Sequence, residues 1–279
     1  IYTLSLHDAL PISTSDLRKA MIEHFIWPGL KANALYEGVY PLNSAYSRPL
    51  IAQALVYIAH KEGAVAIAHG CTGKGQDQVR IEVCANSLDP SLEVLAPVRD
   101  WHMTREEEMA YAKEHDIPVP TTRKSPYSLD DNLWGRSCEC GVLENPWNKP
   151  PKGAYGLTKD PLEAPDEPAV IEITFEKGVP VALDGKKMDG IELIDVLNKL
   201  AGSHGVGRID MVENRLVGFK SREVYECPAA VTLITAHKAL ETITLSKDVM
   251  RVKSDLEKKF AELTYEGCWF SPLMDAIRG

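Results

Sequence analysis

The sequence predicts an α/β fold, a partial doubly wound parallel sheet, followed by an α+β unit. Residues 64–70 (AVAIAHG) are a nearly continuous apolar run, which is typical of a buried parallel strand. Helix-like segments lie on both sides of this run, and a second strand-like run spans residues 93–98. Helices and strands therefore alternate, which favours a parallel sheet with helices packed on it.

The helix over residues 46–63 has the clearest signal in this half. Its apolar residues recur at i, i+3, i+4 and i+7, namely Ile51, Ala54, Leu55 and Ile58. Gly63 stands where a glycine commonly ends a helix. Capping residues predict two further helices, at 15–27 with Ser15 or Asp16 as the N-cap and at 105–115 after the capping box Thr104–Glu107.

The second half of the chain is predicted to be α+β. A stretch rich in proline and hydroxyl residues at 117–131 predicts a linker, and a Pro-rich stretch at 144–168 predicts an ordered surface loop. Alternation at Ile171, Ile173 and Phe175, a Lys177–Gly178 turn and the run VPVAL predict a β-hairpin. Apolar periodicity predicts three helices, one bearing Leu193, Val196, Leu197 and Leu200 and the others at 228–245 and 247–264. We infer two domains, 14–118 and 119–279.

The first 13 residues, IYTLSLHDALPIS, fit poorly with the rest of the chain. They have no clear period and do not read as a targeting sequence. They are typical of a translated adapter or fusion remnant, and we exclude them from the fold prediction. An ordinary N-terminal segment is the alternative.

Composition excludes several classes of protein. The 279 residues are 44% hydrophobic and 25% charged, which suits a globular protein with a core. The net charge of −9 argues against a nucleic-acid-binding surface. No apolar run approaches the roughly 20 residues that span a bilayer, and no signal peptide is apparent, which predicts a cytosolic protein. Among six cysteines, Cys138 and Cys140 form C-x-C without a partner pair, so reduced thiols are favoured over zinc.

Residues 66–82, AIAHGCTGKGQDQVRIE, look like a phosphate-binding loop. They do not match the Walker A pattern, because only two residues separate Gly70 from Gly73 and Gly75 replaces the hydroxyl residue. The loop nevertheless comes after a predicted parallel strand and enters a helix near Gln76, which is where ligands bind in open α/β sheets. Its glycines and the helix N-terminus favour an anionic group.

The residues after the glycines suggest a zwitterionic ligand. Asp77 and Arg80 are three apart, so they face the same side of a helix. A carboxylate suits an ammonium group, and a guanidinium grips a carboxylate in bidentate fashion. The alternative is a surface salt bridge. We assign no role to His69, which is more often a packed histidine, and Lys74 has the alternative of a solvated lysine.

Several blocks of the sequence, in order, resemble the argininosuccinate synthase family. The similarity covers almost everything from Ser15 onward. The blocks are ALYEGVYPLNSAYSRPLIA (34–52), AHGCTGKGQDQVRIE (68–82), PYSLDDNLWGRSCECGVLENP (126–146), HGVGRIDMVENRLVGFKSREVYECPAA (204–230) and KFAELTYEGCWFSP (259–272). The resemblance implies an adenine-nucleotide alpha-hydrolase-like domain of the N-type ATP pyrophosphatase class, followed by a synthetase domain.

The resemblance also implies an activity. Such enzymes are ligases that join citrulline and aspartate in arginine biosynthesis and cleave ATP, supplied with Mg²⁺, to AMP and pyrophosphate. The citrulline ureido oxygen is adenylated, and the aspartate amine then displaces AMP. Catalysis of this kind rests on positioning and charge stabilisation, so no catalytic nucleophile is assigned. The family further implies small-molecule substrates and, for the full-length protein, a homotetramer. We assign no resident metal, and the composition predicts neither a nucleic-acid nor a membrane partner.

Site residues are carried over one by one. The resemblance assigns Thr72, Gln76 and Asp77 to aspartate and Gly70 to ATP. It assigns seven residues to citrulline: Tyr40, Gln76, Arg80, Ser128, Ser137, Glu213 and Tyr225. The family usually has Asn at the position of Gln76, whose longer side chain leaves its contact open. Some members have Ser at the position of Ala45, where the neighbouring Ser44 is a substitute.

Each of these residues has a purely structural alternative. Tyr40 and Tyr225 alone would be read as core aromatics with satisfied hydroxyls. Ser128 and Ser137 could be helix caps, since SLDD (128–131) resembles a helix start. Glu213 could lie in a solvated turn.

One family motif is not found. The family's nucleotide domain begins with a strand and a Ser-Gly-Gly-type loop for the ATP phosphates, which would lie upstream of Ser15, and the family continues past WFSPLMDAIRG. We therefore expect a fragment shortened at both ends and without turnover of its own.

Two rival functions remain open. One is another ligase with a related ATP pyrophosphatase domain, either tRNA-modifying or amide-forming. The block at 204–230 and the acidic composition argue against tRNA. The other is a non-catalytic amino-acid-binding module that binds citrulline or aspartate without dependence on ATP.

Overall fold

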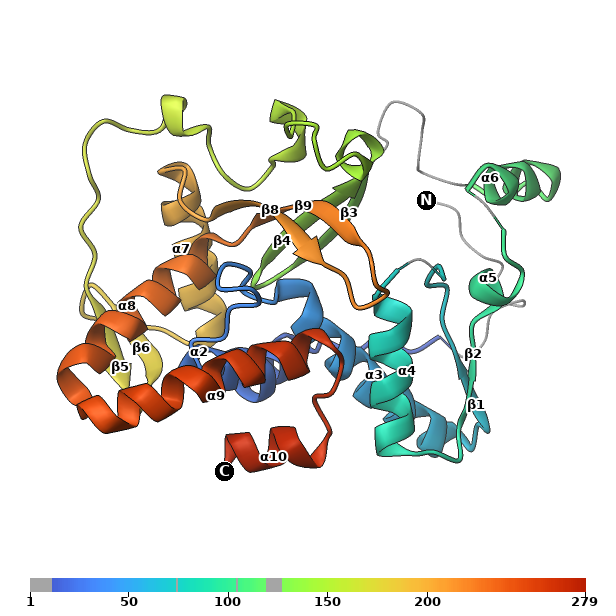
Figure 1. Cartoon of the computed structure of the whole chain (residues 1–279), viewed down its shortest axis with the longest axis horizontal. Coiled ribbons are helices and arrows are strands. Elements are labelled where there is room, and N and C mark those ends of the chain that lie inside the picture. Colours follow the sequence, from blue (N-terminus) through green and yellow to red (C-terminus); the bar gives the residue numbers. More distant parts are fainter. Residues whose placement is uncertain (1–11, 74, 104, 119–126) are drawn as a thin grey trace.

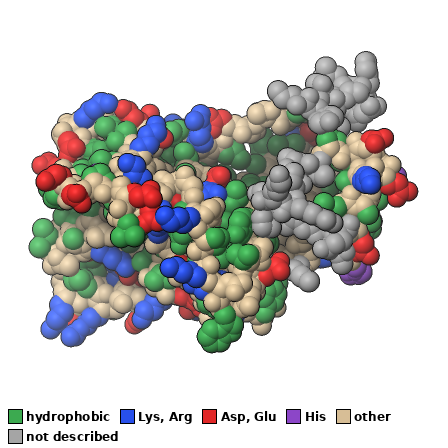
Figure 2. Space-filling view, turned by 90° about the horizontal axis from the view of Figure 1, so that it is seen from above, with side chains coloured by type: hydrophobic (Ala, Val, Ile, Leu, Met, Phe, Trp, Pro, Cys, Tyr) green, Lys and Arg blue, Asp and Glu red, His purple; other side chains and the backbone are tan. Residues whose placement is uncertain are grey.

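The computed structural model describes residues 12–73, 75–103, 105–118 and 127–279 (Figure 1). Figure 1 shows β1, β2 and α4 at one end of the molecule, β5 and β6 at the other, and a four-stranded sheet between them. The space-filling view shows Lys and Arg side chains interspersed with Asp and Glu over the face turned to the viewer (Figure 2).

The N-terminal half begins with one continuous helical segment. It consists of α1 (Arg18–Met21), a turn of π-helix (Ile22–Ile26) and α2 (Trp27–Lys31). The N-cap position is Leu17 and not Ser15 or Asp16 as predicted, although Asp16 accepts a hydrogen bond from the Arg18 amide at 3.0 Å. The long helix α3 (Asn43–Glu62) begins three residues before the predicted start, and Gly63 ends it in the left-handed conformation at φ 65°.

A short parallel sheet comes after α3. Strands β1 (Ala66–Ala68) and β2 (Glu93–Leu95) pair in parallel, and α4 (Asp77–Leu88) connects them. The predicted parallel pair is confirmed, while the doubly wound arrangement stays a prediction. Two short helices, α5 (Pro97–Asp100) and α6 (Arg105–Glu114), complete this half. The proposed cap Thr104 lies outside the described residues.

The C-terminal half is built on an antiparallel sheet in the order β3-β4-β9-β8. The strands are β3 (Tyr127–Asn132), β4 (Gly135–Cys140), β8 (Arg208–Asn214) and β9 (Lys220–Glu226). The predicted linker was therefore too long, because residues 127–131 belong to β3, where they pair with β4. The reading of 128–131 as a helix start was wrong for the same reason. Residues 119–126 lie outside the described residues.

The remaining elements surround this sheet. The 144–168 stretch is an ordered loop with short 3₁₀ turns, and the turns in this region are Gly141–Glu144, Lys152–Ala154 and Pro161–Glu163. The predicted hairpin is confirmed as β5 (Ile173–Glu176) and β6 (Val179–Leu183), with a short β7 (Lys186–Lys187) beside it. The four helices are α7 (Gly190–Ser203), α8 (Pro228–Thr244), α9 (Lys247–Tyr265) and α10 (Pro272–Arg278).

One apolar core joins the first helices to this second half. Phe25 packs on Trp269 with ring centroids 4.7 Å apart, and Trp134 is 1% exposed. The Trp134 indole donates to the Pro41 carbonyl at 2.9 Å, which fixes the chain just before α3. The entry to α3 is therefore held against β4, and both contribute to one cavity.

Gly267 brings the end of α9 against α4. Its φ of 80° lies in the left-handed region, and an added Cβ would come within 2.7 Å of the Arg80 Cα. The Gly267→Ala substitution is expected to lower the free energy of unfolding by about 1–3 kcal/mol from backbone strain, and further because the new Cβ would clash with Arg80. The measurement is urea unfolding. Gly218→Ala is the matched control, because Gly218 has φ 93° with open space around it. Equal losses in both variants would contradict a role for the close approach.

Candidate functional site

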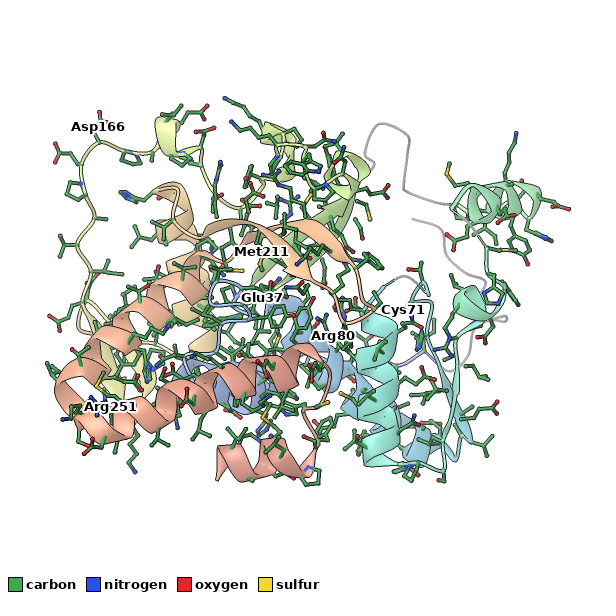
Figure 3. The ribbon with its side chains drawn as sticks, viewed as in Figure 1. Glu37, Cys71, Arg80, Asp166, Met211 and Arg251 are labelled. Carbon is green, nitrogen blue, oxygen red and sulfur yellow. The ribbon has the colours of Figure 1, made fainter. Side chains whose placement is uncertain are left out.

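A cavity of about 210 Å³ lies between the N-terminal ends of α3 and α4 and one face of the four-stranded sheet. Figure 3 labels Arg80 on α4. Strands β3, β4, β8 and β9 carry Ser128, Ser137, Glu213 and Tyr225. The seven residues assigned to citrulline all line this cavity: Tyr40, Gln76, Arg80, Ser128, Ser137, Glu213 and Tyr225. Asp77, assigned to aspartate, lines it as well.

The sheet supplies its share of the cavity through strand alternation. On β9, Tyr225 is directly paired with Ser137 of β4, so both side chains leave the same face. Glu223, two residues before Tyr225, shares that face, and so does Glu139, two residues after Ser137. Register therefore places two hydroxyls and two carboxylates over one opening.

Glu213 is the centre of the hydrogen bonding beneath the cavity. It is 1% exposed and accepts from the hydroxyls of Tyr225 and Tyr265, each at 2.7 Å, and from the Gln76 side-chain amide at 3.1 Å. Gln76 in turn accepts from the Leu216 amide at 2.8 Å. The expectation that Glu213 lies in a solvated turn was wrong, because it sits within β8. Three donors to one carboxylate fix the orientation of the Gln76 amide.

Tyr40 and Tyr225 form an aromatic wall. Their rings stack with centroids 3.9 Å apart, and the Ser44 amide donates to the Tyr40 hydroxyl at 3.1 Å. Burial raises the pKa of both phenols well above the ordinary value. Both hydroxyls are therefore neutral and bonded, as their structural alternative supposed. Both residues also line the cavity, so the two interpretations are compatible.

Arg80 is buried and pairs with the half-buried Asp77. Arg80 is 4% exposed and donates to the Tyr265 carbonyl at 2.7 Å and to Asp77 at 3.2 Å, with its guanidinium 4.6 Å from the Tyr265 ring centroid. The i,i+3 contact exists, but the expectation of a surface salt bridge was wrong. Burial alone would lower the pKa of Arg80, yet it is raised, chiefly by the Asp77 carboxylate.

A second arginine binds the other side of Asp77. Arg48 donates to Asp77 at 2.6 Å and to Asp130 at 2.8 Å. Burial would raise the pKa of the Asp77 carboxyl, but the guanidiniums of Arg48 and Arg80 hold it below its ordinary value. Asp77 is therefore ionised, with one oxygen on each arginine. It positions both arginines at the cavity.

The structure leaves some predicted residues outside the cavity. Thr72 and Gly70 are exposed on the loop before α4, and a Cβ at Gly70 would meet nothing within 4 Å. Ala45 is fully buried, whereas Ser44 lines the cavity with its hydroxyl 3.4 Å from that of Ser137. The role of Ser44 as a substitute at the citrulline site stays a prediction.

Lys74 lies outside the described residues. Only one of the two ring nitrogens of His69 has a hydrogen-bond partner among the described residues. Its Nδ1 accepts from the Cys71 amide at 3.2 Å, while its Nε2 is buried and finds no partner within the described part of the chain.

Sequence reasoning missed five charged residues that line the cavity: Arg48, Asp130, Glu139, Arg215 and Glu223. Strand alternation was the available signal for three of them, since Asp130, Glu139 and Glu223 each stand two residues from an assigned residue. The other two, Arg48 and Arg215, needed the tertiary structure, because α3 and the turn after β8 are far apart in sequence.

Two kinds of feature are absent from the described residues. No group of three or more His, Cys, Asp or Glu in that part of the chain is arranged to hold a metal ion. Likewise, none of the helices described is long and apolar enough to cross a membrane. All six cysteines are free thiols.

Comparison with known proteins finds matches along the chain. A sequence profile described as "Arginosuccinate synthase N-terminal HUP domain" matches residues 6–118, and one described as "Arginosuccinate synthase C-terminal domain" matches residues 127–279. A curated protein of Halalkalibacterium halodurans named argininosuccinate synthase is 60% identical over 269 residues, which cover 96% of this chain and 66% of that protein. Its namesake in Bacillus licheniformis is 61% identical over 264 residues, or 95% of this chain and 66% of the relative. The chain thus spans just under two thirds of their length.

Proposed function

The chain belongs to the argininosuccinate synthase family, and from that premise we propose that it serves the ATP-dependent condensation of citrulline with aspartate in arginine biosynthesis. In this reaction the ureido oxygen of citrulline attacks the α-phosphorus of ATP and releases pyrophosphate. The aspartate amine then attacks the ureido carbon, and AMP leaves with the oxygen. The products are argininosuccinate, AMP and pyrophosphate.

The observation that supports this proposal best is the convergence of all seven citrulline residues on one cavity. Arg80 offers a further donor there, since its Nη2 has no hydrogen-bond partner in the described part of the chain. A guanidinium with a free nitrogen in a buried pocket suits the carboxylate of an amino acid. Ser128, Ser137 and Tyr40 supply polar and aromatic surface around it.

The other substrates are assigned to the loop that precedes α4. We place aspartate at Thr72, Gln76 and Asp77, so that Gln76 lies between the two amino acids. ATP, carried as its Mg²⁺ complex, is placed along Gly70, where the exposed backbone leaves space for a nucleotide. We keep the domain division at 118–119, with residues 1–13 set apart, and propose a cytosolic homotetramer that binds neither nucleic acid nor membrane.

The first test is citrulline binding to this chain, measured by calorimetry with and without ATP. We expect citrulline to bind and norvaline, which has the same backbone but lacks the ureido group, to bind at least tenfold more weakly. No detectable citrulline binding by a folded chain would overturn the proposal. A citrulline affinity that is the same with and without ATP would favour the non-catalytic binding module instead.

A further inference from the structure

Glu223 is a buried carboxylate that lines the cavity with half of its hydrogen-bonding capacity unused. Its side chain is 3% exposed. The Ser221 hydroxyl and the Arg215 guanidinium both donate to the same oxygen, Oε1, at 2.7 Å and 2.5 Å. Across the described residues, Oε2 receives no hydrogen bond. Because Glu223 also lines the cavity, it offers an acceptor there.

Glu213 differs from Glu223 in this respect. Both of its oxygens are occupied, Oε1 by Gln76 and Tyr265 and Oε2 by Tyr225. A ligand ammonium could bind Glu213 only by sharing or displacing one of these donors. Glu223 can accept such a group at Oε2 without displacing a protein donor, since an ionised carboxylate has about four lone-pair sites and the two donors share one oxygen.

The charges around Glu223 leave it poorly compensated. Arg215 is shared between Glu223 and Glu139, and Glu213 lies on the adjacent strand β8. Burial, and next the charge of Glu139, raise the pKa of the Glu223 carboxyl to about 8, with Arg215 acting in the opposite sense. Near pH 7 the Glu223 carboxyl is therefore mostly protonated, and a cation that binds it from the cavity would displace this proton.

Resting on the proposed function, we propose that Glu223 binds the α-ammonium group of citrulline, while the guanidinium of Arg80 in the same cavity binds its carboxylate. This makes Glu223 a further binding residue of the cavity, beyond the seven assigned from the family. Glu213, which is one of those seven, also positions Gln76, Tyr225 and Tyr265 through its hydrogen bonds.

The proposal has a consequence for protons. A carboxyl with a raised pKa is mostly protonated below that pKa, and a bound ammonium favours its ionised form. Citrulline binding should therefore release on the order of one proton near pH 7. The release should shrink as the pH rises through about 8, because Glu223 is then already ionised before citrulline arrives.

The experiment is calorimetry of the full chain with citrulline in buffers of different ionisation enthalpy, at several pH values. Glu223→Gln should abolish the proton release and weaken citrulline binding by about tenfold or more. The matched control is Glu176→Gln, which replaces an exposed carboxylate on β5, away from the cavity. It should leave both the proton release and the citrulline affinity unchanged.

A second measurement needs no variant. The citrulline analogue 5-ureidopentanoate lacks the α-ammonium, so it should bind the unaltered chain more weakly than citrulline and without proton release. Glu223→Gln should bind both ligands about equally. Citrulline binding without proton release, or with equal affinity in Glu223→Gln, would overturn the assignment while leaving the proposed function intact. A chain that binds no citrulline would instead contradict the proposed function.

Discussion

Replacing Arg80 with methionine is expected to remove citrulline binding and to lower the free energy of unfolding by about 3 kcal/mol or more. The substitution deletes donors to Asp77 and to the Tyr265 carbonyl, all within a buried region. It also leaves Asp77 with Arg48 as its remaining guanidinium partner. The cavity would lose its carboxylate-binding group and keep an excess of negative charge, so the ligand carboxylate would be repelled.

The measurements are citrulline calorimetry and urea unfolding. The matched control is Arg251→Met on α9, whose side chain is 72% exposed and makes only a long ion pair at 4.0 Å. This control should change both readouts by less than about 0.5 kcal/mol. Arg80→Lys should restore part of the stability and little of the binding, because an ammonium cannot reproduce the planar fork. Full binding by Arg80→Met would remove Arg80 from the site.

Replacing Glu213 with glutamine is expected to lower the free energy of unfolding by about 2–3 kcal/mol. The carboxylate accepts from three donors, while a glutamine amide provides only one acceptor oxygen and turns its NH₂ toward another donor. One tyrosine hydroxyl or the Gln76 amide would then lie buried without a partner. Citrulline affinity should fall as well, because Tyr225 and Gln76 would no longer be fixed at the cavity.

Urea unfolding and near-ultraviolet circular dichroism of the tyrosines give the two readouts. Glu176→Gln is the control, since Glu176 is an exposed carboxylate on β5, far from the cavity. We expect it to leave both signals unchanged. A Glu213→Gln variant as stable as the parent chain would show that the three hydrogen bonds carry no net stabilisation.

Local patterns predicted the elements of this fold more successfully than their assembly. The helix over α3 and its end at Gly63 were predicted from apolar spacing and a C-terminal glycine, because both signals act within a few residues. The strand β3 was mistaken for a linker, because YSLDDN contains few β-forming residues and is held in place by pairing with β4. Such pairing is a tertiary effect that a single sequence does not display.

In the site too, contacts within one helix were predicted from the sequence, whereas contacts between distant elements were not. Asp77 and Arg80 were found together because they lie three residues apart on one helix. The other citrulline residues were predicted from the sequence blocks that resemble the family. Arg48 and Glu223 were not predicted. Arg48 reaches Asp77 from α3 across 29 positions, and Glu223 approaches the cavity only through the register of β9. Neither relation is visible before the strands and helices are placed.

The long-range contacts that hold Gln76 and Arg80 also bear on the time at which the binding site forms. Gln76 meets Glu213 across 137 positions, and Arg80 meets the Tyr265 carbonyl across 185. Closing loops of this size costs entropy before the stabilising contacts form, which slows folding. Since the N-terminal part of a chain emerges first during synthesis, α4 cannot make these contacts until the end of α9 has been synthesised. Ligand binding therefore belongs to the last stage of maturation, and a nascent chain can gain no stabilisation from citrulline until residue 265 has left the ribosome.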